Sequence, residues 1–269
     1  MIQNPPVAPN LPDEIVQAAT VSQMGPFTGL YKPRISSPLA IVGIVAGTII
    51  ADIILLVLVL LLTGYIFYAL VLIPIVAIIY GIYALLHYKV RIYTFAQGLI
   101  YAKSEKIDIA RWDQVAAVWQ VQRRQRYGYS YGGIIAALIF RSNMRESYKL
   151  QRNDGITISI ASASVSNIQE LGQVIQYEIT QRQSPQAIAA FNTGQPIPFG
   201  PFTVSQQGIA RANGGQLPWN QVALVDTQRG SLIIKQTGKT LNWAASPVGK
   251  IPNLGVFNAV VYHARSNAR

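Results

Sequence analysis

The sequence contains no cysteine, only two histidines and 11 acidic residues. The absence of cysteine excludes a disulfide framework, a cysteine-based metal site and a thiol nucleophile. Two separate histidines cannot form a cluster, and the scattered acidic residues match neither a His-Glu-x-x-His motif nor a calcium-binding loop. Glycine-rich nucleotide-binding motifs are also missing. We therefore expect no enzyme activity, no cofactor and no metal site.

Charged residues make up only 12% of the chain, about half of the roughly 25% typical of soluble proteins. The deficit is concentrated in residues 38–86, which contain no basic residue and a single acidic one, Asp52. A helix needs about 20 apolar residues to cross the hydrocarbon core of a bilayer. The segment therefore predicts two transmembrane helices, at about 39–62 and 65–86, joined by a short turn into a hairpin.

Basic residues flank this hairpin on both sides, with Lys32 and Arg34 before it and Lys89 and Arg91 after it. The positive-inside rule then places both ends of the hairpin in the cytoplasm. We predict a multi-pass protein of the cell membrane, with two spans and both termini cytoplasmic. Small residues spaced four apart in the first span favour close packing of helices, so a homodimer through the hairpin is a further prediction.

Asp52 lies near the middle of the first predicted span, where a charged carboxylate costs about 2.5 to 3.5 kcal/mol on insertion scales. One interpretation is an ion or proton site. The other is an interhelical hydrogen bond, for example to a carbonyl group freed by Pro74. The spans contain no second ionisable group, so we favour the structural interpretation.

After residue 88 the pattern changes to short alternating apolar runs separated by Gly, Asn and Asp, which is typical of strands and turns. The alternation predicts strands in the first part of this region at 90–95, 98–103, 106–110, 112–122, 147–152 and 156–160. An internal repeat is also present, because the sequence Trp-Asp-Gln-Val-Ala-Ala-Val at 112–118 returns as Trp-Asn-Gln-Val-Ala-Leu-Val at 219–225. Each copy is predicted to be a small antiparallel sheet closed by one C-terminal helix.

Four segments of the two copies, 93–99, 111–112, 199–202 and 241–244, resemble the bacterial pleckstrin-homology-like (PH-like) fold. The whole pattern is similar to an uncharacterised family of bacterial membrane proteins with a two-helix anchor and tandem PH-like domains. The resemblance implies an α+β membrane protein, in which a two-helix transmembrane hairpin precedes two PH-like antiparallel β-barrel or sandwich domains, each closed by a C-terminal helix. It implies an architecture and no particular chemistry, because one fold hosts many functions.

The predicted domain organisation has five parts. They are a mobile cytoplasmic N-terminal tail (1–36), the two transmembrane helices (37–88), a first PH-like domain (89–183), a helical linker (184–196) and a second PH-like domain (197–269). The N-terminal tail is expected to be mobile because it is rich in proline, with one or two helical turns at residues 14–19 as the alternative.

The long connection inside the first domain has the highest density of basic residues in the chain. Beside a bilayer, each basic residue would contribute about 1 kcal/mol of attraction to anionic lipid, and aromatic rings favour the headgroup level. We predict a site for lipid or the membrane surface made of Arg123, Arg124, Arg126, Tyr127, Tyr129, Tyr131, Arg141 and Arg145. The alternative is a pair of strands packed into the barrel, with a solvated basic turn.

These observations predict a membrane-anchored cytoplasmic binding or scaffolding protein whose PH-like domains contact anionic lipid headgroups or the membrane surface. The alternative is an adaptor that binds a protein or peptide through a sheet edge or groove. Tyrosines alternating with Arg and Gly are also similar to RNA-binding segments. For a membrane-anchored chain, however, we do not expect a nucleic-acid partner.

Overall fold

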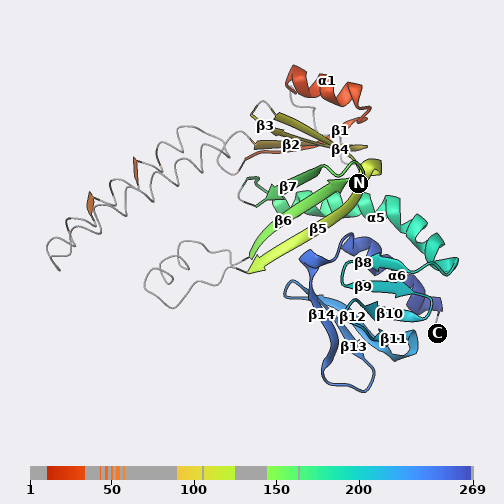
Figure 1. The fold of residues 1–269 in the computed structure, drawn as a ribbon. Helices are drawn as coiled ribbons and strands as arrows, with labels where there is room; N and C mark the ends of the chain where they lie inside the picture. The colour runs from red at the N-terminus through yellow and green to blue at the C-terminus, as the bar shows by residue number, and fades with distance from the viewer. Residues whose placement is uncertain are drawn as a thin grey trace, which may run out of the picture.

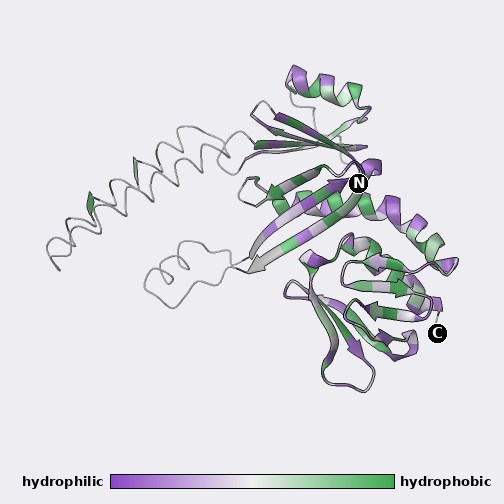
Figure 2. Ribbon diagram, in the orientation of Figure 1, coloured by the Kyte–Doolittle hydropathy of each residue, from purple (hydrophilic) through white to green (hydrophobic). Residues whose placement is uncertain are grey.

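The computed structural model describes residues 11–33, 90–104, 106–124, 144–162 and 164–267, together with single helical positions between 43 and 57. Two sheet-and-helix units, which we call repeat 1 (27–192) and repeat 2 (197–267), lie against each other (Figure 1). Hydrophobic and hydrophilic residues are interspersed along the strands and helices of both repeats (Figure 2). This pattern is expected of elements with one buried and one exposed face.

Repeat 1 consists of two antiparallel sheets and one long helix. The four-stranded sheet has the order β1-β2-β3-β4, with bounds Phe27–Tyr31, Val90–Phe95, Gly98–Lys103 and Lys106–Arg111. A 3-10 turn, Trp112–Gln114, leads to the three-stranded sheet of β5 (Val115–Arg124), β6 (Met144–Arg152) and β7 (Thr157–Ala161). Helix α5 (Ile168–Asn192) closes the unit and leads on to repeat 2.

Repeat 2 has the same order of elements in shorter form. Its four-stranded sheet consists of β8 (Ile197–Phe199), β9 (Phe202–Ser205), β10 (Gly208–Arg211) and β11 (Gln216–Leu217). A 3-10 turn, Trp219–Gln221, precedes the sheet of β12 (Val222–Gln228), β13 (Ser231–Gln236) and β14 (Asn242–Pro247). A last 3-10 turn, η3 (Val248–Lys250), leads to helix α6 (Leu254–Asn267).

Each repeat has its own apolar core between its sheets and its helix. In β7 the alternating pattern turns Ile158 and Ile160 inward and leaves their neighbours exposed, as expected for a strand with one covered face. Trp112 and Trp219 are buried at equivalent places, each at the start of a 3-10 turn. Strands β2 to β7 lie within a few residues of the positions that the alternation predicts, whereas β1 lies in the segment assigned to the N-terminal tail.

The N-terminal segment, which we expected to be a mobile tail, contains a helix and a strand within residues 11–33. Helix α1 (Asp13–Val21) covers the outer face of the first sheet, and β1 pairs with β2. The reason lies in β2, where Tyr93 and Phe95 are buried on the face turned away from the main core. A sheet that is apolar on both faces needs a cover on each. The tail supplies the outer cover with Ile15 and Met24, which are both buried.

The structure contradicts the predicted two-helix transmembrane hairpin. Among the residues that the structure describes, no helix combines the length and the apolar character needed to cross a membrane. The longest described helix, α5, contains the ion pair of Glu178 with Arg182, so its length is not matched by an apolar surface. Most of residues 37–88, including Asp52, lie outside the described residues.

The same finding corrects several predictions that depended on the hairpin. The predicted fold class is contradicted: no helix of the described residues can span a membrane, and the described strands form four separate antiparallel sheets. The two-span location in the cell membrane, the bilayer as an integral partner and the homodimer through the hairpin are contradicted as well. The prediction rested on the apolar run at 38–86, whereas a membrane span also requires a continuous helix of about 20 residues, and none of the described helices meets both conditions.

Candidate functional site

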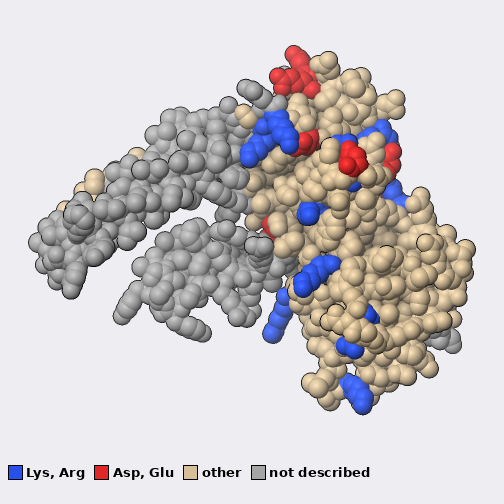
Figure 3. Space-filling view, viewed as in Figure 1, with Lys and Arg blue, Asp and Glu red and all other residues tan. Residues whose placement is uncertain are grey.

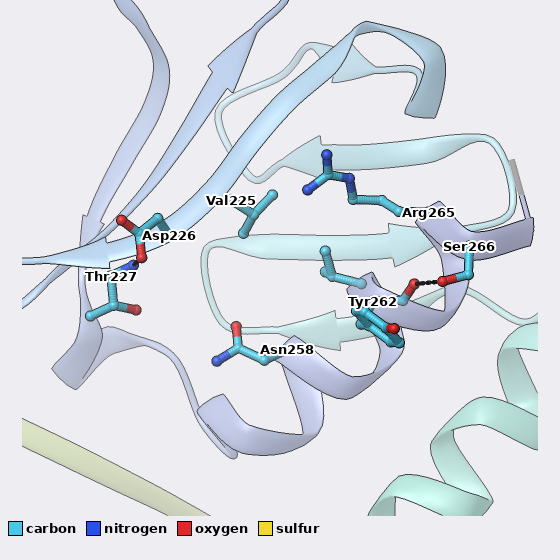
Figure 4. A pocket seen from close by; sticks show the side chains of 8 residues that line it. Val225, Asp226, Thr227, Asn258, Tyr262, Arg265 and Ser266 are labelled. Atoms are coloured by element: carbon cyan, nitrogen blue, oxygen red, sulfur yellow. Dashed lines mark hydrogen bonds between the residues drawn. The ribbon is translucent and has the colours of Figure 1, made fainter. Parts of the chain in front are cut away.

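A groove lies between β12 and α6 in repeat 2, and we call it the β12–α6 groove. Its volume is about 480 Å³. Figure 4 shows its lining side chains, which come from one strand and one helix. These residues are Val225, Asp226 and Thr227 of β12 and Asn258, Val261, Tyr262, Arg265 and Ser266 of α6.

The groove runs along a sheet edge, because β12 is the outermost strand in the order β12-β13-β14. An edge strand turns backbone N–H and C=O groups away from its sheet. Val225 is only half-buried, and the following residues of β12 are exposed. The aromatic ring of Tyr262 stands at the side of the groove and is 77% exposed. The groove therefore offers hydrogen-bonding backbone beside an exposed aromatic ring.

The equivalent groove in repeat 1, between β5 and α5, is occupied by the turn that precedes α6. In this turn Asn253 donates from its backbone N–H to Val118 O at 2.8 Å, and Val118 N–H donates to Asn253 Oδ1 at 2.7 Å. The amide nitrogen Nδ2 of Asn253 donates to Ala116 O at 3.0 Å and to Gln183 Oε1 at 2.8 Å. The edge of β5 is thus hydrogen-bonded to a segment of the chain from outside its own repeat.

The two edge strands correspond residue by residue. The sequence repeat aligns Ala116 and Val118 with Ala223 and Val225. Both strands also carry a bulge at the same place, after their first residue. Because the bulge and the register agree, the N–H and C=O groups of Val225 point into the β12–α6 groove as those of Val118 point toward Asn253. Val118 is 1% exposed under its docked turn, whereas Val225 is more open to solvent.

A tyrosine fills part of the equivalent groove in repeat 1. Tyr148 of β6 lies opposite Gln120 of β5. Its ring packs so closely on Gly172 of α5 that a Cβ atom at Gly172 would lie 2.0 Å from the ring. The register places Leu232 of β13 opposite Thr227, so the smaller Leu232 takes the place of Tyr148 in repeat 2. Burial raises the pKa of the Tyr148 hydroxyl, and the nearby Glu146 carboxylate raises it further. Tyr148 is therefore a neutral filler of the groove beside Gln120 and Gly172, while the docked turn occupies the groove at Ala116 and Val118.

The β12–α6 groove is lined by one basic and one acidic residue, Arg265 and Asp226, while the other charged residues of repeat 2 are basic. Arg265 Nη2 donates to the backbone oxygen of Ala223 at 3.2 Å. Asp226 is the one acidic residue in the sequence from 197 to 269, and its oxygens accept hydrogen bonds from Thr227 N at 2.7 Å and Gln228 Nε2 at 3.0 Å. In Figure 3 the face over repeat 2 shows Lys and Arg and no acidic side chain, while acidic groups lie over repeat 1.

The residues that the sequence predicted for a lipid or membrane-surface site lie mostly outside the described residues. Arg123 and Arg124 end β5, and the register places Arg123 opposite Arg145 of β6. Their side chains are not described, nor are the other members of the predicted site, which are Arg126, Tyr127, Tyr129, Tyr131 and Arg141. The predicted site therefore stays a prediction.

Sequence reasoning did not single out the residues of the β12–α6 groove. A signal was present in the helices, because Asn167 and Asn253 both precede the closing helix in the left-handed conformation. Counting from these two residues aligns Arg265 of α6 with Ile179 of α5, which is 1% exposed. A cation in α6, at the position where α5 has a buried apolar residue, indicates that this face of α6 is not covered in repeat 2. That signal becomes visible only once the helix starts are known.

The described residues contain no group of three or more His, Asp or Glu side chains that could hold a metal ion. Over residues 1–269 the chain matches a family of unknown function, DUF6585. No curated protein matches the sequence.

Proposed function

The chain belongs to this family of unknown function, and we propose that it is a protein-binding adaptor that holds an extended segment of a partner protein in the β12–α6 groove. One observation carries the proposal. The equivalent edge in repeat 1 already binds a segment from outside its repeat, through three hydrogen bonds with Asn253, and a fourth joins Asn253 to Gln183 of α5. The matching edge at Val225 has the same backbone register and an open groove beside it.

The proposed binding is the addition of a peptide to a sheet edge. In this mode the backbone of the edge strand supplies affinity, and pockets beside it supply specificity. Here Val225 would exchange hydrogen bonds with the peptide backbone or a side chain, while Tyr262 and Asn258 would contact it from α6. Tyrosine is well suited to this role because its large rigid ring gives contact area with little loss of conformational entropy.

The lipid-binding alternative keeps its status as a prediction, as does the expectation that the protein is not an enzyme. The side chains of Arg123 and of the other residues of that predicted site are not described. The groove, in contrast, consists of described side chains with defined partners. We therefore base the proposal on the groove.

Site-specific photo-crosslinking in the native cell tests the proposal. A photoreactive amino acid at Tyr262 is expected to capture a partner protein, whereas the same amino acid at Tyr177 of α5, which is 62% exposed, is the matched control and should not. The substitution Val225→Pro removes the groove-facing N–H, at an edge position where proline is tolerated. It should abolish the adduct at 262 while the protein remains folded. Equal adducts at both positions, no adduct at 262, or an adduct that survives Val225→Pro would contradict the proposal.

A further inference from the structure

The carboxamide side chain of Asn253, which docks on repeat 1, has the donor and the acceptor that its partners on β5 require. Val118 offers one N–H donor, and Ala116 offers one carbonyl acceptor. A carboxamide has one acceptor oxygen and one donor nitrogen, so Asn253 satisfies both groups at once. The edge of β5 is therefore selective for a group that both accepts and donates.

The β12–α6 groove presents a different set of partners. The carbonyl of Ala223, which corresponds to that of Ala116, already accepts a hydrogen bond from Arg265 Nη2. The acceptor of repeat 1 is thus replaced by a cation, while the donor at Val225 remains. A guanidinium group has five N–H donors and no acceptor, so Arg265 keeps donors for a ligand. The two polar groups that face a ligand here, the N–H of Val225 and the guanidinium of Arg265, are therefore both hydrogen-bond donors.

The only acidic side chain of repeat 2 does not neutralise Arg265. Asp226 accepts from Thr227 N and Gln228 Nε2, and Figure 4 places it across the groove from Arg265. No ion pair joins the two among the described side chains. The remaining charges of repeat 2 are basic, which attracts acidic segments over a longer range.

We infer that the β12–α6 groove selects an acidic segment of the partner, with an Asp or Glu carboxylate in the place that Asn253 takes in repeat 1. The carboxylate accepts from Val225 N–H and from Arg265, because an ionised carboxyl group has acceptors only. Hydrogen bonds between ions of this kind are also stronger than neutral ones. This inference rests on the proposed function and specifies the chemistry of its ligand.

A second copy of this chain fits the groove poorly. Its equivalent turn, in repeat 1, presents Asn167 in place of an acid and has Gln169 where the docked turn has Gly255. A Cβ atom at Gly255 would lie 2.1 Å from Thr180 Oγ1 of α5. Ser266, which corresponds to Thr180, retains a hydroxyl group at that place in α6. The equivalent turn of a second copy therefore does not match the groove, and the occupant that we infer is an acidic segment of a different protein.

Three synthetic peptides test the inference with the full-length protein. Each has the sequence of residues 247–258, and they differ only in carrying Asn, Asp or Lys at the position of Asn253. Binding is followed by NMR at the backbone amide of Val225. The Asp peptide should shift this amide proton downfield and bind about tenfold more tightly than the Asn peptide, since a charged hydrogen bond contributes more than a neutral one. The Lys peptide should not bind.

Two variants assign the preference to one residue. Arg265→Gln should reduce the preference for Asp over Asn to about none, because a neutral amide replaces the cation. Arg211→Gln is the matched control, since Arg211 belongs to the same repeat but stacks on the ring of Trp243 at 4.5 Å; it should keep the preference. Equal or tighter binding of the Asn peptide, or a preference that survives Arg265→Gln, would overturn the inference while leaving the proposed function intact.

Two further outcomes separate the inference from the proposed function. If no peptide moves the Val225 amide, the proposed function fails and the inference fails with it. If phosphatidylserine vesicles move the Val225 and Arg265 signals and the peptides do not, the anion is a lipid headgroup, and the assignment to an acidic protein segment is overturned.

Discussion

At the scale of single residues, Asn253 joins the two repeats. It has a φ of 50°, in the left-handed region that asparagine tolerates better than most residues. This conformation lets its backbone and its side chain reach β5 together. Asn167 has nearly the same backbone, with a φ of 56°, and no capping hydrogen bond from its side chain. The two asparagines therefore share a local conformation but differ in their distant contacts.

This difference predicts unequal effects of one substitution. Asn253→Gly should lower the free energy of unfolding by about 2 kcal/mol, because three side-chain hydrogen bonds of about 0.5 to 1.5 kcal/mol each are lost and water replaces part of them. Glycine keeps the left-handed conformation, so backbone strain does not contribute. Asn167→Gly is the control and should change stability by less than about 0.5 kcal/mol. Urea unfolding measures both, and similar losses in the two variants would refute the role of Asn253.

At the scale of secondary-structure elements, the contact between β6 and α5 decides whether a groove is open. Tyr148 fills the space beside β5 and rests on Gly172. In repeat 2 Leu232 is smaller, and Asn258, which corresponds to Gly172, lines the groove at its surface. The same pair of elements thus forms a closed core in one repeat and an open groove in the other.

The close contact of Tyr148 with Gly172 predicts a coupled pair of substitutions. Gly172→Ala should lower the free energy of unfolding by about 1 to 3 kcal/mol, because the added methyl group overpacks the interface. Combining it with Tyr148→Leu should cost less than the sum of the single changes, because the leucine makes room for the methyl group. A double-mutant cycle by chemical denaturation measures this coupling. Additive losses would show that the ring and the glycine do not constrain each other.

At the scale of the whole molecule, the two repeats form one packed body. Helices α5 and α6 contact each other, and η3 lies against β5. The close approach of Gly255 to Thr180 belongs to this interface. Asn253 is hydrogen-bonded to Val118, which lies 135 residues away in the sequence. The repeats therefore stabilise each other although each has its own core.

The interface predicts cooperative unfolding. Scanning calorimetry of the natural protein should show one transition for the two repeats. Gly255→Ala should separate it into two, because the new Cβ atom would meet Thr180 Oγ1 at 2.1 Å and push the helices apart. Thr180→Ala removes that oxygen, so the double variant should regain a single transition. Two transitions in the natural protein, or no rescue in the double variant, would contradict this description.

Much of the local structure could be predicted from the sequence. The alternation in residues 157–161 and the repeated Trp-x-Gln-Val pattern at Trp112 and Trp219 identify strands and their order, because these features depend on neighbours along the chain. One or two helical turns were considered for residues 14–19, within α1, but the packing of this helix over Tyr93 and Phe95 was missed, since it requires knowledge of both faces of the sheet. The transmembrane hairpin was inferred from the length of the apolar, almost uncharged stretch at 38–86 and from its basic flanks, and it is contradicted because no helix of the described residues can span a membrane.

By itself, the sequence determined two similar units of strands and a closing helix, because periodicity and turn residues act over a few positions. Only the tertiary structure decided which sheet edge is occupied. The turn at Asn253 docks on Val118 of β5, which is 135 residues away in the sequence. The equivalent edge of repeat 2, at Val225 of β12, faces an open groove. Such a choice depends on the shapes of two packed units, and these shapes exist only after the chain has folded.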